Sequence, residues 1–431
     1  MKVAYIMSRF PNLTETFVLY EIIALERHGV ATTVYPLLRT RQRVVHPEAE
    51  SIAGRAHYHP FLSLPILSAN WHFLRRCPRT YFGAFAEILR GTWGSANFFV
   101  GAVGIFPKAV RFAYEMAKEG VTHVHAHFSN HPTVAALIVH RLTGIPFSFT
   151  AHGHDVHVDR RMLEEKVNAA EFAVMISGYN QRLVAEKSQG VDPEKLHVIH
   201  CGADTEFFLP RTAQRTDGRF SLVCAGSFIE VKGHRYLLEA CRLLKDRLLE
   251  DPLVKDRGLS LRCHLIGDGP ERHRIVEQIA AAGLQADIIL EGALPRPRVA
   301  ELMRGADVIV QPSVPTRRGA REGIPVSLME GMACGLPAVA SRISGIPELV
   351  EDGRTGFLVQ PRDATALADA LGRLLEDPRL RHEMGQAGRQ KVLEEFDLDR
   401  NAAKLATLIA AVASRQRDDS PQASLTQKGG R

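Results

Sequence analysis

The sequence predicts an α/β protein with two doubly wound, Rossmann-like parallel sheets. In both halves of the chain, short apolar and β-branched runs alternate with segments of helical periodicity, which is typical of parallel strands covered by helices. The alternation starts again at residue 220, after the polar segment LPRTAQRTDGR. Because 431 residues are too many for one compact core, we expect two domains, 1–209 and 210–385.

The first domain is expected to alternate strand and helix from its first residues. KVAYIM reads as a strand, SRFPNL as a loop, TETFVLYEIIALERHG as a helix closed by Gly29, and VATTVYPL as the next strand. The runs VTHVHAHF, IPFSFTAH, FAVMIS and LHVIHCG continue the series. The first loop and helix start supply candidates for binding a second substrate: Asn12, Thr14, Glu15 and Thr16. Alternatively, Thr14 only caps the helix.

Residues 57–112 have a different composition. Aromatic, Leu and Ile residues are interleaved with Arg and Lys, and acidic residues are nearly absent. One interpretation is a surface that rests on anionic lipid headgroups or meets a lipid-linked substrate. The other is a pair of amphipathic helices packed on the first domain. Both interpretations require helices with an apolar face.

The second domain repeats the α/β scheme. Its expected strands lie in FSLVCAGSF, SLRCHLIGDGP, DIILEG, DVIVQPS, PAVAS and GFLVQP. A helix over 386–413 is expected to cross back to the first domain, followed by a disordered polar tail over 414–431. Two such halves suggest a cleft between them, with ligands at the carboxyl ends of the strands.

Composition narrows the classes of partner. A net charge of +6 and a pI near 9.0 favour nucleotide, phosphate or an anionic membrane surface, and no nucleic-acid-binding motif accompanies them. No run approaches the about 20 apolar residues of a membrane span, and no signal peptide is apparent. Six cysteines show no C-x-x-C spacing. We expect a reduced, cytoplasmic protein that can rest peripherally on the inner face of the cell membrane.

Three loops after predicted strands of the second domain carry candidate binding residues. AGSFIEVKGH holds Gly226 and Lys232, LIGDGP holds Gly267, and QPSVPTRRGAREGIPVSLMEG holds Glu322 and Glu330. Glycine after a strand lets a ligand approach the backbone closely. Neither glycine loop matches a dinucleotide or P-loop motif. Each loop alone can be a plain turn, but three loops at one sheet edge indicate a site.

The helix in PVSLMEGMAC is expected to begin near Pro325, a favoured first-turn position. Its positive end would then offer free backbone N–H groups to an anion. These are the amides of Gly323, Ile324, Val326 and Ser327. An ammonium such as Lys232 at ~4 Å adds about 4 kcal/mol at an effective dielectric of 20. A diphosphate can thus be neutralised without a metal ion.

The two carboxylates of this segment stand eight positions apart and need different roles. Glu322 would repel phosphates, so it should face a sugar, which gains oxocarbenium character in the transition state. Glu330, about two turns further on, can accept hydrogen bonds from two vicinal hydroxyls, as on a ribose. Alternatively, Glu330 pairs locally and Glu322 is a solvated surface charge.

The segment FTAHGHDVHVD follows a predicted strand of the first domain. It carries His152, His154, Asp155 and His157. This spacing resembles the H-x-H-x-D-H box of metallohydrolases, but the Asp comes one position early and no second His cluster follows. We therefore expect no metal, and we expect His152 to project from the strand end and hydrogen-bond a hexose hydroxyl. The preceding histidines of THVHAHF alternate on one face of a strand predicted to be buried.

Together these segments resemble retaining glycosyltransferases of the GT4 type, which have the GT-B fold. REGIPVSLMEGMACGLPAVAS is similar to their E-x7-E signature. VCAGSFIEVKGH, LIGDGP, VIVQPS, TAHGHD and GIPELVEDGRTGFLVQPRD resemble further segments in the same order. FPNLTETFV resembles the N-terminal loop of members that build bacterial exopolysaccharide, of the colanic-acid type, on a lipid carrier. The resemblance covers roughly residues 1–410.

The resemblance implies a role for each domain. The second would bind a UDP- or GDP-sugar, with Glu322 on the hexose, Glu330 on the ribose and Lys232 on the diphosphate. The first would bind a glycan or a polyprenyl-diphosphate-linked saccharide, with His152 beside the transferred sugar. No cofactor is implied, and the reaction would be retaining hexosyl transfer in cell-surface polysaccharide biosynthesis. The alternatives are a nucleotide-sugar epimerase or phosphorylase, a metallohydrolase, and a non-catalytic sugar-binding module.

One position departs from the family pattern. Many members have Arg after the first glycine, where this chain has Ser227, so one of two expected diphosphate cations is missing. Lys232 would have to suffice, or a nearby arginine would have to substitute. The candidates are Arg317, Arg318 and Arg321.

Overall fold

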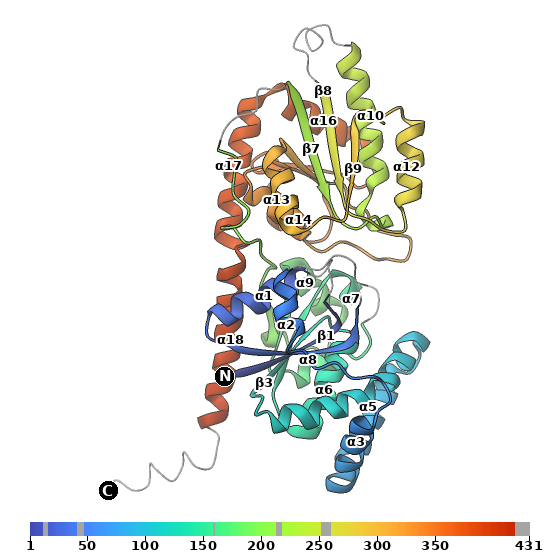
Figure 1. The fold of residues 1–431 in the computed structure, drawn as a ribbon, viewed down its shortest axis with the longest axis vertical. Coiled ribbons are helices and arrows are strands. Elements are labelled where there is room, and N and C mark those ends of the chain that lie inside the picture. The colour runs from blue at the N-terminus through green and yellow to red at the C-terminus, as the bar shows by residue number, and fades with distance from the viewer. Residues whose placement is uncertain (12–15, 41–46, 158–159, 213–217, 251–259, 419–431) are drawn as a thin grey trace, which may run out of the picture. The chain divides into compact units, whose positions relative to one another are not determined.

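The computed structural model folds into two compact units, which we describe separately (Figure 1). The first unit comprises Met1–Ile176, Asn180–Ile199 and Ala402–Arg431, and the second comprises Ser177–Tyr179 and His200–Asn401. The chain thus changes unit at Ile199/His200, whereas the sequence placed the boundary after residue 209. The structure describes all residues except 12–15, 41–46, 158–159, 213–217, 251–259 and 419–431.

The first unit is built on a six-stranded parallel sheet with the order β2-β1-β3-β4-β5-β6. Its strands are β1 (Lys2–Phe10), β2 (Ala31–Arg39), β3 (His123–His127), β4 (Phe147–Ala151), β5 (Phe172–Met175) and β6 (Leu196–Val198). The predicted parallel α/β class is confirmed, but β1 runs on to Phe10 through residues expected in a loop. Strands β3 and β4 are buried along their whole length, including the histidines of β3 and Ser148 and Thr150 of β4.

Helices cover both faces of this sheet (Figure 1). They include α1 (Thr16–Arg27), α2 (Pro47–Ala53), α6 (His131–Thr143), α7 (Gly153–His157), α8 (Leu163–Ala169) and α9 (Gly178–Lys187). The helix α1 buries one apolar face, and α6 is buried along most of its length and ends at Gly144 in the left-handed conformation. The strand order reverses between β1 and β3, so loops after these strands open a site at the sheet edge.

Residues 57–112 contribute three helices, α3 (Leu64–Arg76), α4 (Pro78–Thr92) and α5 (Ala96–Lys118). We call them the insertion helices. Their inner faces join the core of the first unit, for example through Phe73, Ala84 and Ile88. None of the helices in the described ranges is long and apolar enough to cross a bilayer. Packing on the first unit explains the buried inner faces of these helices, but not the apolar side chains that they expose.

The second unit holds another six-stranded parallel sheet, with the order β12-β11-β10-β7-β8-β9. Its strands are β7 (Arg219–Ala225), β8 (Ser260–Ile266), β9 (Ile288–Gly292), β10 (Val308–Gln311), β11 (Ala338–Ser341) and β12 (Gly356–Val359). Five of them lie within the runs predicted for them, and β7 begins one residue before its run. The order reverses between β7 and β10, so the loops after these two strands flank the expected ligand position.

Helices follow most strands of the second unit. The helices of this unit are α10 (His234–Glu250), α12 (Arg272–Ala281), α13 (Arg296–Gly305), α14 (Val326–Ala333), α15 (Ile346–Leu349), α16 (Ala364–Glu376) and α17 (Pro378–Glu395), and α18 (Leu398–Asp418) begins in it. Aspartates cap three of the later ones, α16, α17 and α18. In α16, Asp363 accepts the N–H of Ala366 at 2.8 Å, and leucines at helical spacing enter the core.

The C-terminal region forms two helices instead of the single helix expected over 386–413. The helix α17 ends at Glu395, and Asp397 caps α18 by accepting the N–H of Arg400 at 2.9 Å. Asp397 also accepts the hydroxyl of Thr205 at 2.6 Å. Residues of α18 up to Asn401 belong to the second unit and those from Ala402 to the first. The expected tail over 414–431 lies largely outside the described residues.

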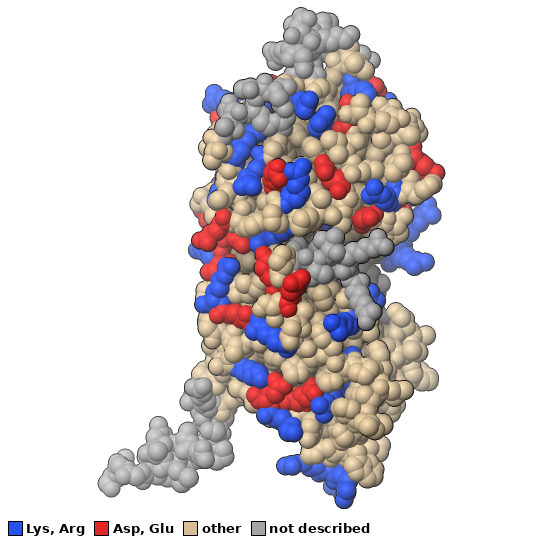
Figure 2. Space-filling model, viewed as in Figure 1, with Lys and Arg blue, Asp and Glu red and all other residues tan. Residues whose placement is uncertain are grey.

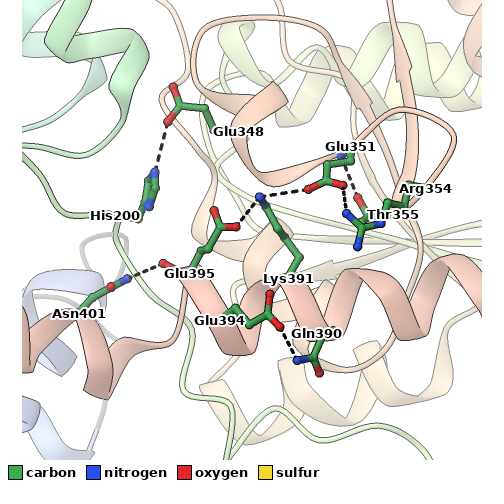
Figure 3. A network of polar contacts seen from close by, with 10 residues as sticks. All are labelled: His200, Glu348, Glu351, Arg354, Thr355, Gln390, Lys391, Glu394, Glu395 and Asn401. Atoms are coloured by element: carbon green, nitrogen blue, oxygen red, sulfur yellow. Dashed lines mark hydrogen bonds and ion pairs between the residues drawn. The ribbon is translucent and has the colours of Figure 1, made fainter.

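Ion pairs fix α17 within the second unit (Figure 3). Lys391 on α17 lies between Glu351 and Glu395, with N···O distances of 3.1 and 2.6 Å. In the same network His200 contacts the carboxylate of Glu348 on α15 at 3.2 Å. These contacts hold the first residues after the unit boundary against the segment that follows β11.

Candidate functional site

The three strand-end loops of the second unit (226–233, 267–271 and 312–325) touch one another through their backbones. Phe228 donates its N–H to the carbonyl of Asp268 at 2.9 Å, and Val314 donates to Val231 at 2.8 Å. A Cβ at Gly233 would lie 2.0 Å from the carbonyl oxygen of Pro312, and Gly233 has φ +68°. Only glycine fits this close approach and this left-handed backbone. The predicted clustering of the three loops at one sheet edge is therefore confirmed.

Two predicted site residues meet where these loops converge. Lys232, at the end of the 3-10 turn Glu230–Lys232, places its ammonium nitrogen 2.7 Å from a carboxylate oxygen of Glu322. Both side chains are mostly buried, with 14% and 17% exposure. The lysine stem passes Gly226, where a Cβ would come within 3.1 Å of the lysine Cε. The lysine and the first carboxylate of the E-x7-E segment thus form one ion pair.

The helix α14 begins where the sequence predicted. Its first residue is Val326, preceded by Pro325 as the N-cap, and its first backbone bond runs from Leu328 to Pro325 at 3.1 Å. The amides before Leu328 therefore have no partner inside the helix. They belong to Gly323, Ile324, Val326 and Ser327, and they stand beside Glu322 in the chain. This helix start can hold an anion.

Glu330 lies one turn into α14 and differs from Glu322 in its surroundings. Its side chain keeps partial exposure, but the surrounding protein displaces enough water to raise the pKa of the carboxyl to about 7. The charge of Arg296 opposes that rise. Near neutral pH, Glu330 can therefore be present in both protonation states, and a ligand that accepts or donates hydrogen bonds selects one of them.

Sequence reasoning missed Arg296. This arginine is the first residue of α13, and its guanidinium contacts Asp204 at 3.0 Å and lies 4.1 Å above the ring of Phe207. Its side chain is only 10% exposed. A signal was present, because Arg296 follows the strand β9, whose carboxyl end lies at the same sheet edge as the three loops.

Ser227 occupies the position where many family members have an arginine. Ser227 lies between Gly226 and Phe228, and its carbonyl accepts the N–H of Ile229 at 2.9 Å. The arginines proposed as substitutes, Arg317, Arg318 and Arg321, are exposed on the loop after β10. Arg321 donates to the hydroxyl of Tyr179 at 3.2 Å.

In the first unit, His152 follows β4 directly and belongs to a chain of polar side chains. Its Nε2 lies 3.2 Å from Nδ1 of His127, and Nε2 of His127 lies 3.0 Å from a carboxylate oxygen of Glu21. The hydroxyl of Tyr5 donates to the same oxygen at 2.9 Å. We call Glu21, His127 and His152 the histidine chain. Burial, followed by the neighbouring His127, lowers the pKa of His152 to about 3, so its ring is neutral.

Two aromatic rings clamp His152. The rings of Phe17 and Phe128 lie 4.8 and 4.6 Å from the imidazole. Phe128 follows β3 with φ +74°, a strained conformation for a bulky residue. The turn is braced by Asp155, which accepts the N–H of Ser129. Burial raises the pKa of Asp155 to about 6. Phe17 and Glu21 were not predicted, although a single acid in the apolar run FVLYEIIAL is a signal.

The first-unit candidates for the second substrate are only partly covered by the structure. Thr16 is the first residue of α1 and is partly exposed. Asn12, Thr14 and Glu15 lie outside the described residues. Their role in binding an acceptor therefore stays a prediction.

Among the described residues, the metallohydrolase-like segment does not form a metal-type cluster. Asp155 binds a backbone amide, and the side chain of His154 lies outside the described residues. The groups with suitable spacing are Glu21 with His125 and His127, and His57 with His59 and Glu115. In the first group, the two nitrogens of His125 face the hydroxyls of Ser148 and Thr150 at 2.8 and 3.0 Å. In the second, Arg111 pairs with Glu115 at 2.5 Å.

Comparison with known proteins places this geometry in a family. The family model for Glycosyltransferase Family 4 matches residues 90–207, and the model for glycosyl transferases group 1 matches residues 208–391. The putative colanic acid biosynthesis glycosyltransferase WcaL of Salmonella typhimurium is 35% identical over 230 residues, which cover 52% of this chain and 53% of WcaL. The chain thus spans about half the length of this curated relative.

A second relative and a solved structure extend the match. The GDP-mannose-dependent alpha-(1-6)-phosphatidylinositol monomannoside mannosyltransferase of Mycolicibacterium smegmatis is 30% identical over 277 residues, covering 61% of this chain and 69% of the relative. The crystal structure of Anabaena HepE with UDP-glucose has a TM-score of 0.68 at 16% identity, covering 95% and 100% of the two chains, and shares the fold. The chain therefore belongs to the group 1 glycosyl transferases, also described as Glycosyltransferase Family 4, and its two parallel-sheet units form a GT-B fold.

Proposed function

We propose that this protein transfers a hexosyl unit from a UDP- or GDP-sugar to a saccharide acceptor, with retention of configuration and without a metal ion. The observation that carries the proposal is the contact between Lys232 and Glu322 at the start of α14. The three strand-end loops bring together a cation, a carboxylate and free helix amides. A nucleotide-sugar needs these groups for its diphosphate and its sugar ring.

Donor binding would rearrange this ion pair. A diphosphate carries more negative charge than one carboxylate, so it competes for the ammonium of Lys232 and is also stabilised by the amides of α14. Glu322, released from the lysine, would then face the hexose hydroxyls. Glu330 would accept hydrogen bonds from the ribose, and Arg296 would counter its charge. One carboxylate thus serves each ring of the donor.

The chemical step balances without a protein nucleophile. The bond between the anomeric carbon and the diphosphate oxygen breaks, and the acceptor oxygen bonds to the same face of that carbon. The departing phosphate oxygen takes the proton of the acceptor hydroxyl. Lys232 and the start of α14 stabilise the charge that develops on the leaving group, while Glu322 stabilises the oxocarbenium character of the ring. His152 would hydrogen-bond a hydroxyl of the transferred hexose.

We further propose that the acceptor saccharide is carried on a lipid and that the insertion helices rest on an anionic membrane. Of fourteen exposed large hydrophobic side chains among the described residues, eight fall between residues 61 and 100. On α3 they form an outward stripe, with Leu64, Leu67 and Trp71 at 81%, 58% and 61% exposure. These positions are one and two turns apart, opposite the buried Ile66 and Phe73.

The charges on the insertion helices favour an anionic bilayer over a protein as the partner of their exposed apolar side chains. The insertion helices carry exposed arginines at 75, 76, 79 and 90, and Glu87 pairs with Arg141 at 2.9 Å. In Figure 2 the surface over α3 and α5 is largely uncharged, with Lys and Arg at one end. Apolar side chains flanked by arginine suit the boundary between acyl chains and anionic headgroups. The name of WcaL refers to the biosynthesis of colanic acid, and that of the second relative to mannosyl transfer onto a phosphatidylinositol monomannoside. We propose an exopolysaccharide as the product class of this chain.

A donor panel tests the proposal. UDP- and GDP-hexoses are incubated with the protein with and without saccharide acceptors, and the products are identified by NMR. We expect release of nucleoside diphosphate, transfer to an acceptor, an unchanged anomeric configuration and indifference to EDTA. An inverted product would contradict retention, and loss of activity with EDTA would favour metal-dependent chemistry. Donor conversion without transfer to any acceptor would favour an epimerase or a phosphorylase. Donor binding without turnover would favour a sugar-binding module.

A further inference from the structure

We infer that Glu21 and His127 are positioning residues for His152, holding its imidazole in one orientation with the proton on Nε2. His152 then presents Nδ1 as a hydrogen-bond acceptor for a hydroxyl of the transferred sugar. This inference rests on the proposed function, because it assigns His152 to the sugar. It adds Glu21 and His127, two residues that lie outside the segments that resemble the family.

The contacts of the histidine chain run in one direction. Glu21 on α1 receives the Tyr5 hydroxyl and the Nε2 of His127 at one carboxylate oxygen, at 2.9 and 3.0 Å. His127 ends β3, and its Nδ1 lies 3.2 Å from Nε2 of His152. The register of β3 on β4 sets this order, because His127 stands beside Thr150, two residues before His152. Each ring nitrogen between the carboxylate and Nδ1 of His152 is therefore engaged.

The positions of the hydrogens in the histidine chain follow from the charge of Glu21. Burial raises the pKa of the Glu21 carboxyl, but the attraction and hydrogen bond of His127 outweigh it and lower that pKa to about 2, so the carboxylate only accepts. The hydrogen that His127 shares with Glu21 therefore sits on Nε2, and with that single ring proton Nδ1 of His127 accepts. Nε2 of His152 must then donate, which leaves a lone pair on Nδ1.

The surroundings of His127 and His152 indicate that these side chains orient the His152 ring and do not simply fill the core. His127 is fully buried and His152 is 7% exposed, so an apolar pair would fill this space with less cost than an ionised carboxylate and two imidazoles. The Phe17 and Phe128 rings limit the tilt of His152, but neither can choose between its two nitrogens. Among the described residues, the contact that makes that choice is the hydrogen bond from Nε2 of His152 to Nδ1 of His127.

The test compares three variants of the full chain. Glu21→Leu removes the acceptor at nearly the same volume, Glu21→Gln keeps a carbonyl acceptor, and Glu26→Leu is the control on the same helix, where Glu26 pairs with Arg55 at 2.6 Å. We expect Glu21→Leu to lower kcat about 10- to 100-fold, as for partners that orient a functional imidazole. The KM for the donor should stay unchanged, Glu21→Gln should recover most of the activity, and Glu26→Leu should match wild type.

Imidazole nitrogen chemical shifts separate this inference from the proposed function. In the wild type we expect the proton of His152 on Nε2, with a mixture of tautomers in Glu21→Leu. A proton on Nδ1 in the wild type would overturn the inference, as would equal losses in Glu21→Leu and Glu26→Leu. If Glu21→Leu does not fold, Glu21→Gln and the wild-type spectrum still decide. If no sugar is transferred by the wild type, the proposed function fails while the tautomer result stands.

Discussion

The carboxyl edges of the two sheets have the same topology and opposite chemistry. In the first unit, the reversal between β1 and β3 holds a partly buried carboxylate, two imidazoles and two phenyl rings. In the second, the reversal between β7 and β10 holds close-packed glycine loops, an ion pair and a helix start. The first edge is suited to orienting hydroxyls, and the second to holding an anion. The same fold thus supplies two different surfaces through the side chains at its strand ends and on the segments that follow them.

The largest expected effect comes from removing the cation of the second edge. Lys232→Ala should lower kcat/KM for the donor by about 10²- to 10³-fold, the range typical of losing one group that stabilises transition-state charge. Its matched control is Lys245→Ala, because Lys245 pairs with Asp287 at 2.8 Å in the same unit. Steady-state kinetics measure both variants, with thermal unfolding to confirm folding. Near-normal turnover in Lys232→Ala would remove the ion pair from the mechanism.

The next largest effect concerns membrane affinity, which should depend on exposed apolar residues of the first unit but not of the second. Replacing Leu67 and Trp71 by Ser should weaken binding to anionic vesicles by about tenfold or more for each residue, because each buries a side chain worth about 1.5–3 kcal/mol. The exposed Val276 in the second unit, at 45% exposure, supplies the control Val276→Ser. Vesicle flotation at low salt is the measurement. Equal flotation of all variants, or no binding by the wild type, would return the insertion helices to simple packing.

The protonation of Glu330 predicts how donor affinity depends on pH. A ribose binds the ionised carboxylate, so the affinity for nucleoside diphosphate should rise by up to about tenfold per pH unit as pH approaches about 7 from below, and then level off. Calorimetry from pH 5.5 to 8.5 measures this, and Glu330→Gln should bind more weakly with a flat profile. A wild-type profile without this rise would show that Glu330 does not meet the ribose.

The same group has a linked effect on stability. The pKa of Glu330 is raised in the folded state, so the folded protein holds a proton that the unfolded chain releases above about pH 4.5. Its favourable contribution is therefore complete at lower pH and is lost as pH rises through about 7. Unfolding should become easier across that window in the wild type, and this particular trend should be absent in Glu330→Gln.

The smallest expected effect is on the affinity for nucleoside diphosphate when a positive charge is added to the second edge. Ser227→Arg should tighten binding of nucleoside diphosphate by a few fold, because a partly exposed ion pair is worth about 1 kcal/mol or less. Ser260→Arg, at the exposed start of β8, is the control for added charge. Calorimetry at two salt concentrations measures the gain. Unchanged affinity would mean that Lys232 and the helix amides already satisfy the diphosphate.

The second edge was largely predictable from the sequence. Glycine at 233 and 267 reflects backbone contacts between neighbouring loops, and glycine at 226 makes room for the Lys232 side chain; such close contacts leave a pattern of residue types and spacing. The start of α14 is set by Pro325, a local signal. Arg296 was missed because its partners, Asp204 and Phe207, are about ninety residues away along the chain. The first edge was less predictable, because Glu21, His127 and His152 are brought together only by strand order and register.

The sequence by itself determined the alternating α/β pattern, the positions of the strands, the glycine loops and the spacing of the two glutamates, because each depends on local backbone geometry or on periodic burial. The tertiary structure decided which side chains face each other. It joined Lys232 to Glu322, placed Arg296 near Glu330, and linked Glu21 through His127 to His152. These pairings depend on the order of strands in the two sheets, and strand order follows from packing of the whole unit rather than from any local segment.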